Sequence, residues 1–283
     1  MVKIVADSTC DLSKDLIEKY EINILPLHIL LGEKEYEDGV DICPDEIYRW
    51  SDENKTTPKT SAPSIQRAME VIKPLTDQGA EVICFSISGQ MSTSGNVMKL
   101  AAEELDVTDR VSVIDSANLS TGIGLLVVEA AIMAKDHASR AEIVERIETL
   151  KPLVRASFVV DTLTYLYRGG RCSGLAALAG GALKLHPKIS VINGKMEPGT
   201  KYRGSINKAV LHYVEDLDEE IAKAKKDRVF ITHSGCDEEV ISAVKKHLEE
   251  LHIFEEILIT RAGGVISSHC GPGTLGVLFI AES

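Results

Sequence analysis

The first half of the chain repeats a single pattern: a short apolar run, then a polar loop rich in glycine, serine or threonine, then a segment with helical periodicity. The apolar runs cover residues 2–6, 22–31, 81–88 and 111–115. Strands that alternate with helices are joined by crossover connections, which place the strands parallel to one another in one sheet. We therefore predict an α/β fold with a parallel sheet for this half.

Local signals mark turns and helix starts within this pattern. The segment Gly32-Glu33-Lys34 is typical of a hairpin turn, and Pro44 is typical of the first turn of a helix. Ser139 is followed three residues later by Glu142, and this spacing is that of a capping box at a helix start. Each signal predicts the boundary of an element.

The order of strand-like and helix-like segments changes after residue 154. Asn193-Gly194 lies between two strand-like runs and is the strongest hairpin signal in the chain, so we expect antiparallel pairing to begin in the second half. The expected helices there are a small-residue helix over 173–184, a long charged helix over 205–226 and a helix opened by Asp237. The expected strands cover 157–160, 188–192, the run from 195 onward, 228–234, 255–260 and 274–281. We predict two domains, an α/β domain over 1–153 and a smaller mixed α+β domain over 154–283.

Charge and hydropathy exclude several classes of partner. The 283 residues carry a formal net charge of −12 and no long run of lysine or arginine, which argues against nucleic acid or an anionic membrane as the main partner. No segment approaches about 18 consecutive apolar residues, and the N-terminus leads straight into a strand. We therefore expect a cytoplasmic protein without stable membrane insertion.

The cysteines and histidines predict no metal site. No C-x-x-C pair or zinc-ligand spacing is present, so the cysteines are expected to be reduced and mostly structural, with Cys10 and Cys270 as minor candidates for a nucleophile. The six cysteines are Cys10, Cys43, Cys84, Cys172, Cys236 and Cys270. The histidines that read as surface or structural residues are His137, His212, His247 and His252.

Four hydroxyl-rich segments, which we interpret as loops at the ends of elements, are the candidate binding site. They cover residues 60–64, 88–96, 115–122 and 267–273. If the first three meet at the carboxyl edge of the sheet, their O–H groups and helix N-terminal N–H groups could bind one anion. A carboxylate is the economical ligand, because neither a G-x-x-x-x-G-K-[ST] loop nor a G-x-G-x-x-G turn after the first strand is present. The same residue types more often cap helices and tighten turns.

Other readings of these residues stay open at this point. Ser92 with His269 as its base would make a small-molecule serine hydrolase or transferase, although the G-x-S-x-G nucleophile elbow is absent. His269 could equally bind an anion or stabilise its turn, and we favour anion binding. Asp7 and Asp115 follow strands and could contact a metal or a ribose, but Asx turns and helix caps are the commoner use.

A purely regulatory or interaction domain is a third hypothesis. It rests on four basic residues in glycine-rich segments of an acidic chain, which could form a docking spot for an acidic or phosphorylated surface or be solvated loop charges. These residues are Arg168, Arg171, Lys201 and Arg203.

Several ordered motifs, spread over nearly the whole chain, carry a family resemblance. They are Asp7-Ser8-Thr9 with Asp11-Leu12, Thr60-Ser61-Ala62-Pro63-Ser64, Ile87-Ser88 leading to Met91-Ser92, Val113-Ile114-Asp115-Ser116, Tyr165-Leu166 with Arg168-Gly169-Gly170-Arg171, Lys184 with Pro187, and Ser268-His269 with Gly271-Pro272-Gly273. With these motifs the chain resembles the DegV family, fatty-acid-binding proteins that include the FakB subunit of bacterial fatty acid kinase.

The resemblance implies a Rossmann-like N-terminal domain and a smaller mixed domain that enclose one long-chain fatty acid, such as palmitate, stearate or oleate. It implies no cofactor and no catalytic turnover by this chain. By motif, Thr60 and Ser92 correspond to hydroxyls that bind the carboxylate, Ser61 lies beside them, and His269 is a third polar contact.

The resemblance also implies a partner. Arg171 and Arg203 are similar to family positions that help to dock the catalytic subunit of fatty acid kinase, which phosphorylates the bound acyl group. One departure concerns the serine loop, where many members read Leu-Ser-Gly-Thr-Tyr and this chain reads Met91-Ser92-Thr93-Ser94-Gly95. The serine is kept and the tyrosine is absent.

Overall fold

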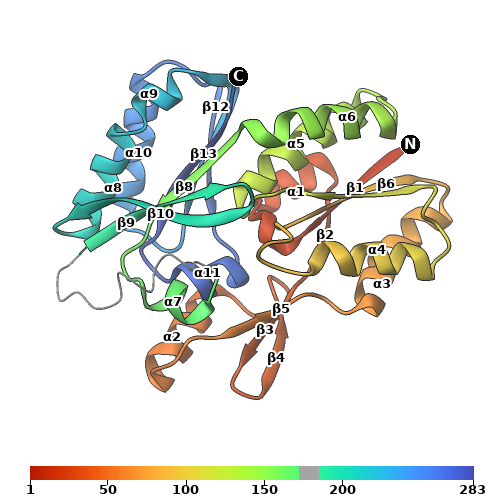
Figure 1. The fold of residues 1–283 in the computed structure, drawn as a ribbon, viewed down its shortest axis with the longest axis horizontal. Helices are drawn as coiled ribbons and strands as arrows, with labels where there is room; N and C mark the ends of the chain where they lie inside the picture. Colours follow the sequence, from red (N-terminus) through yellow and green to blue (C-terminus); the bar gives the residue numbers. More distant parts are fainter. Residues whose placement is uncertain (172–184) are drawn as a thin grey trace.

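The fold is built on three β-sheets within residues 1–171 and 185–283, which are the residues that this computed structural model describes. Figure 1 shows the four-stranded and six-stranded sheets on opposite sides of the molecule, with the three-stranded sheet below and between them in this view. The small-residue helix expected over 173–184 lies outside the described residues.

The four-stranded sheet follows the repeated pattern of the first half. Its order is β2-β1-β6-β7 and all neighbours are parallel, which confirms the predicted parallel sheet. The strands are β1 (Val2–Asp7), β2 (Asn23–Leu25), β6 (Glu81–Ser86) and β7 (Val111–Asp115). The covering helices are α1 (Lys14–Tyr20), α3 (Ile65–Asp77), α4 (Ser94–Glu104), α5 (Thr121–Lys135) and α6 (Arg140–Leu150). Helices α3 and α4 pack on one face and α1, α5 and α6 on the other.

The three-stranded sheet corrects two predictions. Its antiparallel order β4-β3-β5 shows that antiparallel pairing begins in the first half of the chain, not in the second. The apolar run over 22–31 is two strands in two sheets, because Pro26 lacks the N–H that a continuous ladder needs. The predicted turn at Gly32-Glu33 is confirmed, since Leu31 pairs with Lys34 across it. The elements here are β3 (His28–Leu31), β4 (Lys34–Glu37), α2 (Pro44–Asn54) and β5 (Lys59–Ser61).

The six-stranded sheet is mixed, as predicted for the second half. Its order is β10-β9-β8-β13-β11-β12, and only β11 and β12 are parallel neighbours among its described strands. The strands are β8 (Val154–Val159), β9 (Leu185–Ile192), β10 (Lys195–Arg203), β11 (Ala224–His233), β12 (Glu256–Arg261) and β13 (Leu275–Ala281). Helices α8 (Ile206–Glu215), α9 (Asp218–Ile221) and α10 (Glu238–Glu250) cover its outer face.

Helix α5 lies between the two large sheets and joins their cores. Every residue from Thr121 to Ala131 except Glu129 is buried, as expected for a helix that is apolar on all sides. Its side chains share one hydrophobic cluster with Phe85 of the parallel sheet and with Phe158 and Leu278 of the mixed sheet. Helix α5 therefore packs against strands of both sheets.

The boundaries in the second half are partly as predicted. The continuous charged helix over 205–226 is wrong, because α8 ends at Glu215, Leu217 turns into the core with 1 % of its surface exposed, and β11 already begins at Ala224. The Asn193-Gly194 hairpin and the Ser139 capping box are confirmed, as is the helix opened by Asp237, which is the N-cap of α10.

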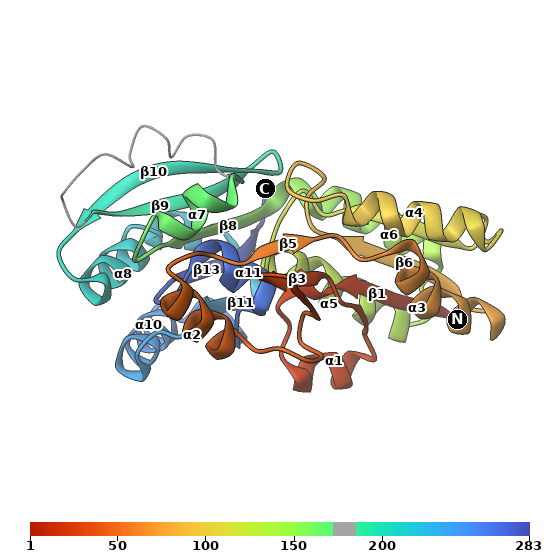
Figure 2. The same ribbon diagram turned by 90° about the horizontal axis from the view of Figure 1, so that it is seen from below.

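The remaining elements connect the sheets. They are η1 (Ser8–Cys10), η2 (Lys151–Leu153), α7 (Thr164–Gly169) and α11 (Gly264–Cys270). Helix α11 packs against α7, α2 and the three-stranded sheet, as Figure 2 shows from below. Strand β8 starts directly after η2, and the division into domains at residue 153 stays a prediction. In the described ranges, no helix is long and apolar enough to cross a bilayer.

Candidate functional site

A cavity of about 470 Å³ lies where the three sheets meet. Its wall combines the loops after β6 and β7 with residues of β8, β10, β11, β13 and α11. Most of the wall is apolar, and representative side chains are Leu27, Ile87, Leu119, Phe158, Leu166 and Leu278. A cavity with this volume and lining suits a ligand with a large apolar part.

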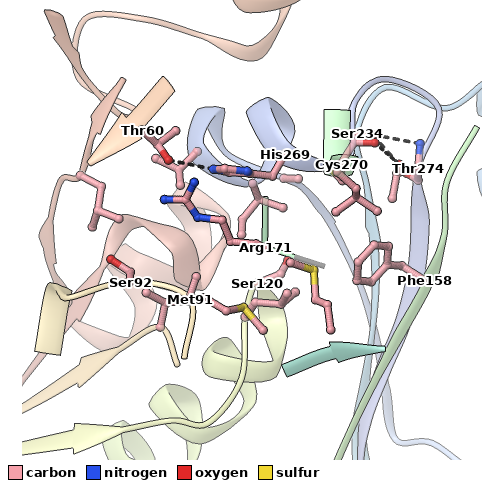
Figure 3. A pocket seen from close by; sticks show the side chains of 18 of the residues that line it. Thr60, Met91, Ser92, Ser120, Phe158, Arg171, Ser234, His269, Cys270 and Thr274 are labelled. Carbon is pink, nitrogen blue, oxygen red and sulfur yellow. Dashed lines mark hydrogen bonds between the residues drawn. The ribbon is translucent and has the colours of Figure 1, made fainter. Parts of the chain in front are cut away.

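Polar side chains from separate elements reach this cavity. Thr60 and Ser61 come from β5, Ser92 from the loop between β6 and α4, His269 from α11, and Arg171 follows α7. The Thr60 hydroxyl and the His269 Nε2 atom share a hydrogen bond of 2.8 Å, and Figure 3 shows the Arg171 side chain in the cavity beside them. All four predicted ligand-binding residues therefore border one cavity.

Two local predictions about these residues are wrong. Thr60 and Ser61 belong to β5 of the three-stranded sheet rather than to a loop. His269 lies in the last turn of α11 and not in a loop. The cavity is therefore bordered by hydroxyls of β5 and of the loop after β6, and by the His269 ring of α11, a helix that packs against both α2 and α7.

Helix α11 is fixed by two buried carboxylates that the sequence reasoning missed. The Gly263 N–H donates to Asp11 Oδ1 at 2.8 Å, and the Gly264 N–H donates to Asp38 Oδ1 at 2.7 Å. Acidic groups at a helix N-terminus stabilise it through the unpaired N–H groups there. A Cβ at Gly264 would lie 2.6 Å from Ile29 Cδ1 and 2.9 Å from Asp38 Oδ1, so a larger residue here would have to displace these side chains. The pair positions the helix that carries His269.

These two carboxylates are also tied to their surroundings. Asp11 accepts a hydrogen bond of 2.5 Å from Ser120 Oγ, and Asp38 accepts one of 2.8 Å from Ser8 Oγ. Burial raises the pKa of both Asp11 and Asp38, because desolvation disfavours the charged carboxylate. In the sequence, Asp11 was visible only as part of a family motif, and Asp38 before Gly39 reads as a turn residue.

The electrostatics of the cavity leave His269 neutral and supply a cation nearby. Burial, and then the charge of Arg171, lower the pKa of His269 to about 4. Its Nδ1 atom is buried without a hydrogen-bond partner among the described residues, and a Cβ at Gly169 would lie 2.3 Å from it. The neutral ring can hold a hydroxyl through Nε2, while positive charge for an anion comes from Arg171.

Ser92 and His269 do not form a catalytic pair in this geometry. Ser92 Oγ accepts a hydrogen bond of 3.3 Å from the Ser94 N–H, and the His269 Nε2 atom is bonded to Thr60. A base with a pKa near 4 is a weak proton acceptor for a serine hydroxyl. The geometry therefore favours binding over nucleophilic attack.

The cysteine and aspartate predictions can be compared with the structure. The five described cysteines are free, as expected, and burial raises the pKa of Cys270 to about 12 and that of Cys10 further. Asp7 accepts from the Thr9 N–H and Asp115 Oδ1 accepts from the Ala117 N–H, which confirms the Asx-turn reading. Within the described ranges, no group of three or more His, Cys, Asp or Glu residues could hold a metal ion.

The two arginines proposed for docking lie in different surroundings. Arg171 is exposed and also lines the cavity, and its Nη1 donates to the Gly169 carbonyl oxygen at 2.6 Å. Arg203 is exposed at the end of β10 and does not line the cavity. Arg168 Nη1 donates to the Lys55 carbonyl oxygen at 3.5 Å, which places it near α2.

A family model described as "Uncharacterised protein, DegV family" matches residues 1–282. The chain belongs to the DegV family. A DegV domain-containing protein of Deinococcus radiodurans is 32% identical over 276 residues, covering 98% of this chain and 97% of that protein. One of Clostridium perfringens is 32% identical over 281 residues, covering 99% of both.

Several solved structures have the same fold. A DegV protein from Thermus thermophilus, described as fatty-acid-binding, superposes with a TM-score of 0.90 at 31% identity, with 99% of both chains covered. A stearic acid-binding protein from Eubacterium ventriosum superposes with a TM-score of 0.86 at 32% identity, covering 100% of this chain and 99% of that one. DegV from Bacillus subtilis, also described as fatty-acid-binding, has a TM-score of 0.85 at 27% identity, with 99% of both chains covered.

Proposed function

We propose that the cavity binds one long-chain fatty acid, such as palmitate, stearate or oleate, and that the chain is a carrier without turnover of its own. The main support is a mostly apolar cavity of about 470 Å³ whose polar border is formed by Thr60, Ser61, Ser92, His269 and Arg171. The carboxylate is assigned to these polar groups, and the acyl chain is assigned to the apolar wall. Similar proteins described as fatty-acid-binding support the assignment.

The energetics of the cavity agree with this ligand. Transferring a carboxylate from water is costly unless donors replace its hydration, and charge-assisted hydrogen bonds from hydroxyls and a guanidinium do so. Thr60 can donate its proton to the ligand while the neutral His269 ring donates to the Thr60 oxygen. Each methylene buried against the wall contributes roughly 0.8 kcal/mol, so affinity should rise with chain length until the cavity is full.

A titration tests the proposal. The delipidated protein is titrated with saturated fatty acids of increasing length, beside Ser92→Ala and the control Ser205→Ala, whose side chain makes no cap hydrogen bond and does not line the cavity. We expect tight binding of long acids by the wild type and Ser205→Ala, and weaker binding by Ser92→Ala. Equal affinity of all three proteins would remove Ser92 from the site, and no binding of any acid by the wild type would refute the proposal.

The hydrolase reading with Ser92 and His269 remains the alternative. It predicts release of product from small esters or acyl donors at a rate that Ser92→Ala abolishes. The Thr60 bond to His269 and the lowered pKa of the ring argue against it. An interaction domain without a lipid would instead bind a protein partner in the absence of any fatty acid.

We further propose that the bound carboxylate is presented to the catalytic subunit of a fatty acid kinase. Arg171 in the cavity and the exposed Arg203 are two cations in a chain of net charge −12, and cations at a contact speed association with an acidic or phosphorylated surface. Nucleic acid is not an expected partner, and the cytoplasmic location stays a prediction.

The kinase proposal has its own test. Formation of acyl phosphate is measured with purified kinase subunit, ATP and loaded carrier, comparing Arg203→Glu with Lys246→Glu, a remote lysine on α10 whose side chain is 74% exposed. We expect a slower reaction for Arg203→Glu, with a loss that shrinks at high salt, and unchanged fatty acid affinity in both. Equal rates for the two variants would exclude Arg203 from docking.

A further inference from the structure

The Asn193-Gly194 turn of the mixed sheet reaches the loop that carries Ser92. Figures 1 and 2 both show the β9–β10 hairpin extending from the mixed sheet towards the loops of the parallel sheet. The Ser88 hydroxyl donates to the Gly194 carbonyl oxygen at 2.7 Å, across 106 positions of sequence, and Ser88 is only 1 % exposed. The contact is therefore a buried polar link between the two sheets.

Ser88 in turn organises the loop. Its Oγ accepts from the Gln90 N–H at 3.2 Å, and its carbonyl oxygen accepts from the Met91 N–H at 2.8 Å and the Ser92 N–H at 3.1 Å. Met91 and Ser92 both line the cavity. Ser88 therefore contacts the hairpin through its hydroxyl and accepts the backbone hydrogen bonds of Met91 and Ser92 through its carbonyl oxygen.

The opposite partner of this contact has to be glycine. Gly194 has φ +77°, and a Cβ on it would lie 2.6 Å from Ser88 Oγ. The next atoms, Gln90 Cγ at 3.5 Å and Ala117 Cα at 3.7 Å, would be ordinary van der Waals neighbours. A side chain at position 194 would therefore press on one atom above all, the oxygen that makes the link.

The geometry points to Gly194 as a positioning residue for the binding site. The Asn193-Gly194 turn accepts the hydrogen bond of Ser88, and Ser88 organises the loop that presents Ser92 to the cavity. A ligand bound by Ser92 therefore dissociates more slowly while this hydrogen bond is formed. Met196 of the same hairpin lines the cavity as well, so the turn fixes two parts of the wall. This role rests on the proposed fatty acid site.

The variants follow from the geometry. Gly194→Ala introduces the close approach to Ser88, and Gly79→Ala is the matched control, because Gly79 has φ +80° and nothing within 4 Å of a Cβ. Ser88→Ala removes the hydroxyl, and the double variant Ser88→Ala/Gly194→Ala removes both the link and the oxygen that the new methyl would press on. Both glycines have a similar positive φ, so alanine is strained at either position.

The first readout is the dissociation rate of a bound fluorescent long-chain fatty acid. We expect up to about tenfold faster dissociation in Gly194→Ala and in Ser88→Ala, because the loss of one buried hydrogen bond sets the upper limit of the effect, and no change in Gly79→Ala. In the Ser88→Ala background, Gly194→Ala should add less than about twofold, because residues in direct contact are not additive. Equal rates in Gly194→Ala and Gly79→Ala, or full additivity in the double variant, would overturn the inference.

The second readout needs no ligand. Amide hydrogen exchange of Met91 and Ser92 in the delipidated protein should be faster in Gly194→Ala and Ser88→Ala than in Gly79→Ala. If the wild type binds no fatty acid, the proposed function fails, and exchange alone decides whether the turn positions the loop. If Gly194→Ala yields no folded protein, Ser88→Ala carries the same expectation, and unchanged exchange in that variant would refute the positioning role.

Discussion

Replacing Thr60 by valine is the substitution that isolates one hydroxyl of the proposed carboxylate site. Valine has nearly the shape of threonine, so the change exchanges an O–H for a methyl group with little steric effect. In the structure this hydroxyl is bonded to His269 Nε2 at 2.8 Å, while the Nδ1 atom of the same ring has no partner within the described residues. The variant therefore leaves both ring nitrogens unpaired.

This geometry sets the expected size of two effects, one on stability and one on fatty acid binding. Leaving a buried polar atom without its partner costs about 1–3 kcal/mol, so the free energy of unfolding of the delipidated protein should fall by that amount. A hydrogen bond to a charged group contributes about 1.5–3 kcal/mol, so losing the Thr60 donor should weaken binding of a long-chain fatty acid by about 10- to 100-fold. Thr60→Ser keeps the hydroxyl and should lose far less of either quantity.

Denaturant unfolding of the delipidated proteins and displacement titration of a fluorescent fatty acid measure the two effects. Wild type, Thr60→Val and Thr60→Ser are compared at the same pH and salt concentration. If Thr60→Val were less stable but bound the acid as tightly as the wild type, the Thr60 hydroxyl would be a structural partner of His269 alone. If both quantities stayed at the wild-type values, the hydrogen-bond argument itself would be wrong.

The remaining predictions concern pH and the cavity wall. Because the pKa of His269 falls from 6.5 in the unfolded chain to about 4 in the folded protein, the unfolded state binds more protons between these values, and stability falls as pH drops through this window. Below pH 4 the full loss in the free energy of unfolding is about 3 kcal/mol. Denaturant unfolding of the wild type and of His269→Gln from pH 7 to pH 4 should show this loss as a difference between the two proteins. Parallel curves of unfolding free energy against pH would contradict it. Phe158→Ala should cost about 3–5 kcal/mol of stability and shift the preferred acid towards longer chains in a competition assay, and an unchanged preference would place the acyl chain away from β8.

The parallel sheet was predictable because its strands are apolar and buried on both faces. The small sheet was not, since Lys34–Glu37 and Lys59–Ser61 contain hardly any apolar residues. These strands form because Ile29 and Leu31 of β3 and Ile47 of α2 pack with Val265 of α11, a contact between distant segments. Propensity over a short window carries no such information.

The break in the predicted helix over 205–226 has a similar cause. Ala224 pairs with Ala281, and this register draws the polar residues Lys225, Lys226 and Asp227 into β11. Their composition alone is more typical of a solvated helix. Tertiary pairing therefore overrides the local preference.

Those residues of the candidate site that belong to sequence motifs were predictable. Thr60, Ser61, Ser92 and His269 were named from motifs, and all four border the cavity. Their order around it was not predictable, nor was the position of Arg171 in the cavity, because these depend on how β5, α7 and α11 meet. The carboxylates that fix α11 lie 252 and 226 positions away from their glycine partners, so no local pattern relates them.

We propose above that the cavity holds one long-chain fatty acid by its carboxylate. Mass spectrometry of the organic extract of purified protein tests it most directly, with the extract of Ser92→Ala measured beside it and protein quantified in both. We predict about one fatty acid per chain in the wild type and clearly less in Ser92→Ala. An empty wild-type extract that stays empty after incubation with mixed fatty acids would contradict the claim and return the hydrolase alternative to first place.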